Sequence, residues 1–135
     1  MAGSVVETMA GSVVENAAYS CEVSTLAEAQ YLCAVLNSGV MDTRLSALRS
    51  REQKAHPHVH KKIFDVAPIP QFDPANPDHA ALVALCAQCA QKVTQWKAGG
   101  MDGATDIGVR RRKARAVIAA ELLQIDGHVR RVLGD

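Results

Sequence analysis

The sequence predicts a mainly α-helical protein. It should have short N-terminal helices, a proline-rich extended strap, a C-terminal antiparallel two-helix hairpin, and one or two short strands. Apolar residues make up 48% of the 135 residues, but aromatic residues only 4%. Alanine, leucine and valine must therefore fill the core, which favours packed helices over a sandwich or barrel. Apolar side chains also recur at three- and four-residue spacing, as on the buried face of a helix.

The first sixteen residues repeat an eight-residue unit, because "MAGSVVET" is followed at once by "MAGSVVEN". A period of eight that occurs twice is too short for a solenoid. The second methionine, Met9, favours a start-site or cloning feature, and a genuine extended arm is the alternative. We expect residues 1–16 to be a flexible arm and residues 17–135 to form a single helical domain, since the length is that of about one domain.

Two segments carry the period-two pattern of a short strand. In residues 16–23, Tyr19, Cys21 and Val23 alternate with small or polar residues. In residues 56–64, histidines occupy every second position at the start of the segment. These two segments are the candidates for the one or two strands.

Residues 24–38 are predicted to form a helix, with Ser24 or Thr25 as N-cap and Glu28 completing a capping box. The apolar residues that fall on one face of this helix are Leu26, Ala29, Leu32, Cys33 and Leu36. The sequence Asn37-Ser38-Gly39 ends the helix, and a second short helix is expected in residues 40–52.

Prolines punctuate the segment "VAPIPQFDPANP", residues 66–77. Each proline removes a backbone donor and holds the preceding residue in the β or polyproline region. We therefore expect an extended strap laid across a surface.

Two long amphipathic helices are predicted after the strap. The first begins with Asp78 as N-cap and closes on Gly99-Gly100. Its apolar seam consists of His79, Leu82, Cys86, Cys89, Val93 and Trp96. The second runs from about residue 108 to residue 133, and its seam consists of Ala114, Ile118, Leu122, Ile125, Val129 and Val132. Two long seams joined by a short connector predict an antiparallel helical hairpin.

The pair Cys86 and Cys89 has the internal spacing of a zinc site, and two of His56, His58 and His60 could complete four ligands. However, both cysteines occupy the helix seam, where a thiol acts as a small hydrophobe, and alternating histidines lack the tight knuckle of zinc fingers. No metal is therefore expected. The sequence shows no signal peptide and no membrane span, so free thiols in a reducing cytoplasm are expected.

Motifs for catalysis and for cofactor binding are missing from the sequence. It contains no GxSxG, no HExxH, no P-loop and no glycine fingerprint after a strand. Aspartate and glutamate are scattered over polar faces, where their usual role is solvation. The chain itself is therefore predicted to have no catalytic residues and no cofactor.

Positive charge is concentrated in two places. The stretch "RRRKAR" puts five cations on the first turns of the last helix: Arg110, Arg111, Arg112, Lys113 and Arg115. The stretch "HVHKK" adds His58, His60, Lys61 and Lys62. Cations near a helix N-terminus oppose its dipole, and such residues commonly contact the phosphates of a nucleic acid. These nine residues are the candidate DNA-binding site, and a solvated helix face is the alternative for the helical group.

The order of the segments resembles the C-terminal region of bacterial adenine-specific DNA methyltransferases of restriction-modification systems. The residues that carry the resemblance are "EAQYLCAVLNSGV", then "HVHKKIFDVAPIPQFDPANPDH", then a helix, then "AAELLQIDGHVRRVLG". The resemblance covers nearly the whole chain, from about residue 14 to residue 134. In that family the first segment closes the target-recognition region, and a helical hairpin finishes the chain.

The resemblance implies a parent protein that transfers a methyl group from S-adenosylmethionine to the exocyclic amine of adenine. This chain lacks the family's Asn-Pro-Pro-aromatic motif, since Asn76-Pro77 is not followed by a second proline. It would therefore be a non-catalytic DNA-recognition or spacer domain. Its partners would be DNA and the parent's catalytic domain, and it could form a homodimer through the hairpin. The alternative is a structural helical module that packs on the catalytic domain or on itself without binding DNA.

Overall fold

The computed structural model describes residues 21–52 and 68–134, and within these ranges the protein is mainly α-helical, as the sequence predicts. The helices are α1 (Leu26–Asn37), α2 (Gly39–Glu52), α4 (Pro77–Ala98), α5 (Ile107–Val117) and α6 (Ala119–Leu133), with a short 3₁₀ helix, η1 (Met101–Gly103). No strand occurs in the described ranges. The repeat in residues 1–16 and the candidate strand in residues 56–64 lie outside them, as does most of the candidate strand in residues 16–23.

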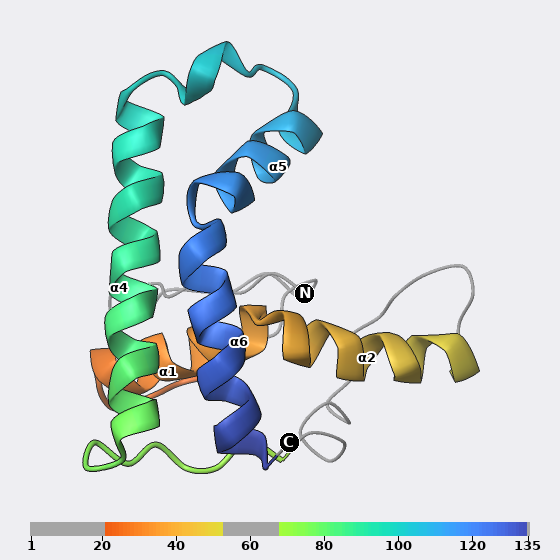
Figure 1. The fold of residues 1–135 in the computed structure, drawn as a ribbon, viewed down its shortest axis with the longest axis vertical. Helices are drawn as coiled ribbons and strands as arrows, with labels where there is room; N and C mark the ends of the chain where they lie inside the picture. The colour runs from red at the N-terminus through yellow and green to blue at the C-terminus, as the bar shows by residue number, and fades with distance from the viewer. Residues whose placement is uncertain (1–20, 53–67, 135) are drawn as a thin grey trace.

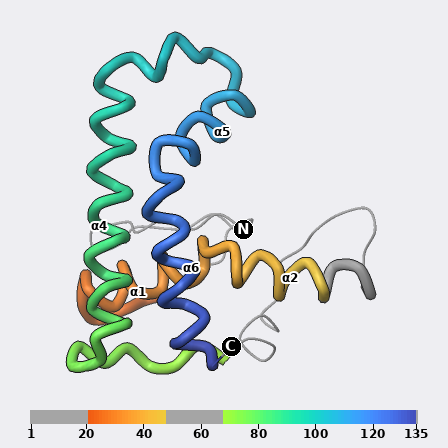
Figure 2. The backbone as a smooth tube through the Cα atoms, viewed as in Figure 1, coloured from red at the N-terminus to blue at the C-terminus, as the bar shows by residue number. Residues whose placement is uncertain are grey.

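Helices α4 and α6 lie side by side and run in opposite directions (Figure 1). Helix α1 packs against the N-terminal half of α4, and α2 projects away from the pair, while α5 leans away at the opposite end (Figure 2). The core lies where α1, α2, α4 and α6 meet. Its largest fully buried side chains are Tyr31, Val35, Met41, Leu82 and Val129.

The start of α1 is built as the sequence predicts. Thr25 is the N-cap, and its hydroxyl accepts a hydrogen bond of 3.2 Å from the amide of Glu28. The carboxylate of Glu28 accepts in return from the amide of Ser24 at 3.3 Å. Two amides at the start of the helix are therefore satisfied by side chains.

The buried face of α1 differs from the predicted one. Leu26, at the start of the predicted face, is 55% exposed, whereas Tyr31, Ala34 and Val35 are buried. Nearly every position between residues 31 and 36 is apolar, so spacing alone could not select the face. Contacts with distant residues decide it, because the hydroxyl of Tyr31 donates a hydrogen bond of 2.9 Å to the carbonyl of Pro70.

A stack of three rings fastens residues 68–76 to α1 and α4. The rings of Tyr31 and His79 lie 4.5 Å apart between centroids, and Phe72 lies 5.4 Å from Tyr31. Nδ1 of the buried His79 accepts a hydrogen bond of 3.0 Å from the amide of Asp73. Burial raises the pKa of Tyr31 to about 12, so its hydroxyl remains a donor at any ordinary pH.

The start of α2 is held by a residue of α6. Oδ1 of Asp126 accepts hydrogen bonds from the amides of Gly39 at 2.7 Å and Val40 at 3.4 Å. The hydroxyl of the buried Ser38 accepts from the amide of Met41 at 3.1 Å. The first three amides of α2 therefore have side-chain partners, two of them from the far end of the chain.

Helix α4 begins two residues earlier than the sequence predicts. Asn76, rather than Asp78, is the N-cap, and its Oδ1 accepts a hydrogen bond of 2.9 Å from the amide of Asp78. The carboxylate of Asp78 is instead bound across the helix pair, to Nδ1 of His128 at 2.7 Å and Nε of Arg131 at 2.9 Å. This acid lies in the first turn of α4 and the two bases in the last turns of α6, so both helix dipoles favour the contact.

This contact predicts a measurable acid sensitivity. Hydrogen bonds from His128, and then from Arg131, hold the pKa of Asp78 below its usual value of 3.8. Since the folded-state pKa is the lower one, the stabilisation is complete above about pH 4 and is lost as the pH falls through the folded-state value. The melting temperature of the unsubstituted protein should therefore fall more steeply below about pH 4 than that of Asp78→Asn. At pH 7, Asp78→Asn should be the less stable of the two.

Thermal unfolding followed by circular dichroism between pH 7 and pH 2 measures both effects. Glu22→Gln, which removes an exposed carboxylate outside this contact, is the matched control and should leave the curve unchanged. If the melting temperatures of the unsubstituted protein and of Asp78→Asn changed with pH in parallel, Asp78 would not stabilise the fold in this way.

The single helix predicted over residues 108–133 is wrong. The chain forms two helices that are separated at Ile118, whose φ and ψ of −109° and 18° are not helical. No proline or glycine marks the break, but Val117 and Ile118 are β-branched, which lowers helix propensity slightly. Helix α5 buries no side chain completely, whereas α6 buries Glu121, Ile125 and Val129.

Candidate functional site

Helix α5 carries the basic cluster that the sequence singles out. Asp106 caps the helix, because its Oδ1 accepts a hydrogen bond of 3.0 Å from the amide of Val109. The eleven residues of the helix include five cations and no acid. The cluster divides into two groups according to what the side chains contact.

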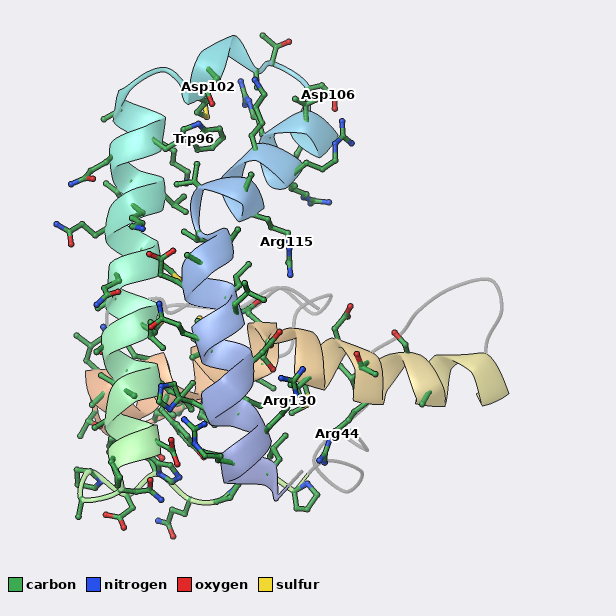
Figure 3. All side chains as sticks on the ribbon, viewed as in Figure 1. Arg44, Trp96, Asp102, Asp106, Arg115 and Arg130 are labelled. Atoms are coloured by element: carbon green, nitrogen blue, oxygen red, sulfur yellow. The ribbon has the colours of Figure 1, made fainter. Side chains whose placement is uncertain are left out.

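The first group holds the turn between α4 and α5. Nε of Arg110 donates to the carbonyl of Ala104 at 2.8 Å, and Nζ of Lys113 lies 3.4 Å from the carbonyl of Asp102. From α4, Nε1 of Trp96 donates to Oδ2 of Asp102 at 2.8 Å (Figure 3). Met101 and Asp102 have φ values of 54° and 53°, a left-handed backbone that these contacts help to stabilise. Arg110 and Lys113 thus have a structural role.

The second group consists of Arg111, Arg112 and Arg115. All three are exposed, and none of their side chains makes a hydrogen bond or an ion pair with any residue in the part of the chain that the structure describes. Arg115 projects away from α4 (Figure 3). Arg111 and Arg115 are four residues apart and Arg112 and Arg115 three, so their like charges face one another on the helix and repel by a few tenths of a kcal/mol per pair.

The other half of the predicted site cannot be placed beside this group. His58, His60, Lys61 and Lys62 lie outside the described residues. The structure therefore brings together the α5 part of the prediction. It divides that part into three outward-facing arginines and two residues, Arg110 and Lys113, that hold the turn.

Arg130 is a further exposed cation that the sequence analysis did not include. Its side chain makes no hydrogen bond or ion pair with the residues of 21–52 and 68–134, and it projects from α6 on the side where Arg115 also projects (Figure 3). The helical period could have found it, since it follows the exposed Leu123 by seven residues and so lies on the same face. The surface formed by Arg111, Arg112, Arg115 and Arg130 is called the arginine face below.

Glu121 is a buried acid that no sequence pattern predicts. It is 5% exposed and pairs with Lys92 of α4 across the helix pair. The hydrogen bond from Lys92 lowers the pKa of Glu121. Its Oε2 is buried without a hydrogen-bond partner among the described residues, which makes the carboxylate depend on Lys92 for its compensation.

The cysteines of the metal alternative lie within the helix, as the seam pattern predicts. Cys86 and Cys89 are half-buried on α4 and pack against the core. The four cysteines of the chain are present as thiols. Among the described residues, no three side chains of the His, Cys, Asp and Glu types lie together in a way that could hold a metal ion. The histidines of that alternative are outside the described ranges.

Comparison of the chain with protein-family models, with curated proteins and with solved structures finds no match. In the described ranges, no helix combines the length and the apolar character that a membrane span requires.

Proposed function

We propose that the protein is the C-terminal DNA-recognition or spacer domain of a cytoplasmic adenine-specific DNA methyltransferase, and that its arginine face contacts the phosphate backbone. The catalytic domain of the parent would bind S-adenosylmethionine, and this domain would engage DNA without catalysis. In this proposal residues 68–76 form a strap between a target-recognition region and the α4–α6 hairpin. The family assignment rests on the resemblance of the segment order.

The observation that carries the DNA contact is the group Arg111, Arg112 and Arg115. Three exposed guanidinium groups without a described partner lie within two turns of one helix, where they repel one another. Binding to a row of phosphates would offset that repulsion by attraction, and the arginines would release counterions from the DNA as they bind. Guanidinium groups suit this contact because their donors match phosphate oxygens in pairs.

Replacing the three arginines with glutamine should weaken binding to duplex DNA at least about tenfold and should do so for any sequence. Each phosphate contact contributes about 0.9 to the slope of log K against log salt, so the slope should become shallower by up to about 2.7. Fluorescence anisotropy with a labelled duplex of about 20 base pairs, between 50 and 300 mM salt, measures both quantities.

Lys97→Gln is the control for one lost charge, because Lys97 is an exposed cation in the last turn of α4 and not part of the arginine face. It should leave the slope unchanged, whereas Arg115→Gln alone should reduce it by about 0.9. If the triple variant bound DNA with the affinity and salt slope of the unsubstituted protein, α5 would have no part in phosphate contact.

A structural interaction module is the second candidate, and exposed apolar side chains favour it. Ile107 is 65% exposed and Leu123 is 74% exposed. Such residues can mark a surface that packs on the catalytic domain or on a second copy through the hairpin. Sedimentation equilibrium distinguishes the two candidates: a tight dimer that does not bind DNA, and that Leu123→Ser dissociates, would replace DNA binding by self-association.

A further inference from the structure

The outward side of α6 is uncharged in its middle and basic at both ends. Glu121, Ile125 and Val129 point into the core, so the opposite side of this helix faces outward. Arg115 and Arg130 project on the same side of the molecule (Figure 3). The exposed residues between these two arginines carry no charge, and they are Ala116, Ala119, Ala120, Leu123 and Gln124. Phosphate contacts need cations, whereas base edges are read by amide and apolar side chains.

Gly127 lies in the middle of this outward side, and the fold gives no reason for a glycine there. A Cβ at residue 127 would meet nothing within 4 Å among the described residues, and the φ of Gly127 is not positive. A glycine inside a helix destabilises it relative to alanine. The helix therefore loses stability at this position without making room for another part of the described protein. A missing Cβ does, however, allow a second molecule to approach the backbone closely.

Leu123 and Gln124 lie on the two sides of Gly127. Together with Ala120 they occupy positions i, i+3, i+4 and i+7 of one helical face, which is called the outer face of α6 below. Leu123 is 74% exposed, and the amide of the exposed Gln124 has no hydrogen-bond partner within residues 21–52 and 68–134. A glutamine amide can form two hydrogen bonds with N6 and N7 of adenine, and an apolar side chain can contact the methyl group of thymine.

We propose that the outer face of α6 enters the major groove of duplex DNA and that Gln124 recognises an adenine base. This inference rests on the proposed function and adds base recognition to it. The major groove is about 12 Å wide and admits an α-helix. The 15 residues of α6 span about 22 Å, so the ends of the helix reach the phosphates that border the groove. Arg115 and Arg130 lie near these two ends, and the small Gly127 lets the helix approach the bases.

Selection of duplexes of about 20 base pairs from a randomised pool, followed by fluorescence anisotropy, tests the base contact. The unsubstituted protein should enrich sequences that share an A·T pair. Exchanging that pair for G·C should weaken its binding at least about tenfold, but should weaken the binding of Gln124→Ala no more than about twofold. Gln91→Ala, which removes an exposed glutamine of α4, is the matched control and should keep the full preference.

Gly127→Leu tests the close approach of the helix to the bases. It should keep or raise the melting temperature, because leucine is the better helix former and a Cβ meets nothing within 4 Å. It should nevertheless weaken binding to an enriched duplex at least about tenfold, because the longer side chain holds the helix away from the groove. Ala87→Leu adds a similar side chain to an exposed position of α4, and this control should leave DNA binding unchanged.

The outcomes separate this inference from the proposed function. A protein that binds the unselected pool but enriches no sequence would overturn the inference alone, and so would a preference that Gln124→Ala keeps. A protein that binds no duplex would overturn both. If Gly127→Leu dissociated a dimer and left DNA binding unchanged, the outer face of α6 would belong to the contact with a second copy of the chain, and base recognition would be wrong.

Discussion

Replacing Leu82 with alanine should lower the free energy of unfolding by about 3–5 kcal/mol, the largest effect that we expect from a single truncation. Leu82 lies on α4 with no exposed surface, in a cluster to which α1, α2 and α6 all contribute. Truncation removes the transfer free energy of the side chain and leaves a cavity that packed helices fill only in part. Urea denaturation followed by circular dichroism measures the loss.

Leu123→Ala is the matched control, since it deletes the same atoms from a leucine of α6 that is 74% exposed. We expect a change of no more than about 0.5 kcal/mol there. Similar losses at the two positions would contradict the burial of Leu82, and so would a loss below about 1 kcal/mol at Leu82.

Replacing Gly39 with alanine should destabilise the protein by about 1–3 kcal/mol, although alanine is the better helix former. A Cβ at residue 39 would lie 2.9 Å from Oδ2 and 3.4 Å from Oδ1 of Asp126. The carboxylate would have to move, and the hydrogen bonds that it accepts from the amides of Gly39 and Val40 would be lost. Asp126→Ala alone should cost about 1–2 kcal/mol, as the loss of a helix cap does.

The two changes should not add. Once Asp126 is alanine, the methyl group at residue 39 meets no carboxylate, and the double variant should be about as stable as Asp126→Ala or slightly more stable. A double-mutant cycle by chemical denaturation should therefore give a coupling of at least about 1 kcal/mol. Gly127→Ala is the control, because a Cβ on that α6 residue meets nothing within 4 Å and should be neutral or stabilising. Additive effects of Gly39→Ala and Asp126→Ala would exclude this explanation.

Local signals in the sequence located the helices well. The capping pair Thr25 and Glu28 and the stop at Gly99 depend on residues within a few positions of one another, and the structure confirms both. Features that depend on contacts between distant residues were not predicted. The face of α1 is selected by contacts such as Tyr31 with Pro70, and Asp78 leaves the cap position for partners about fifty residues away, which no local pattern contains.

The candidate site shows the same division. Counting charges identified the basic stretch of α5, but not which of its cations are bound. Arg110 and Lys113 contact backbone carbonyls of a turn whose left-handed residues could not be foreseen, whereas Arg111, Arg112 and Arg115 face outward.

The hydrogen bonds that Asp126 accepts from the start of α2 have a consequence for how the protein folds. The atoms of that contact are 87 residues apart, and the core around Leu82 also needs Ile125 and Val129 of α6. A nascent chain that ends before α6 has neither the partner for its second helix nor one side of its core. The earlier helices therefore keep apolar faces uncovered until α6 is available to pack on them, so α1, α2, α4 and α6 are expected to fold as one cooperative unit.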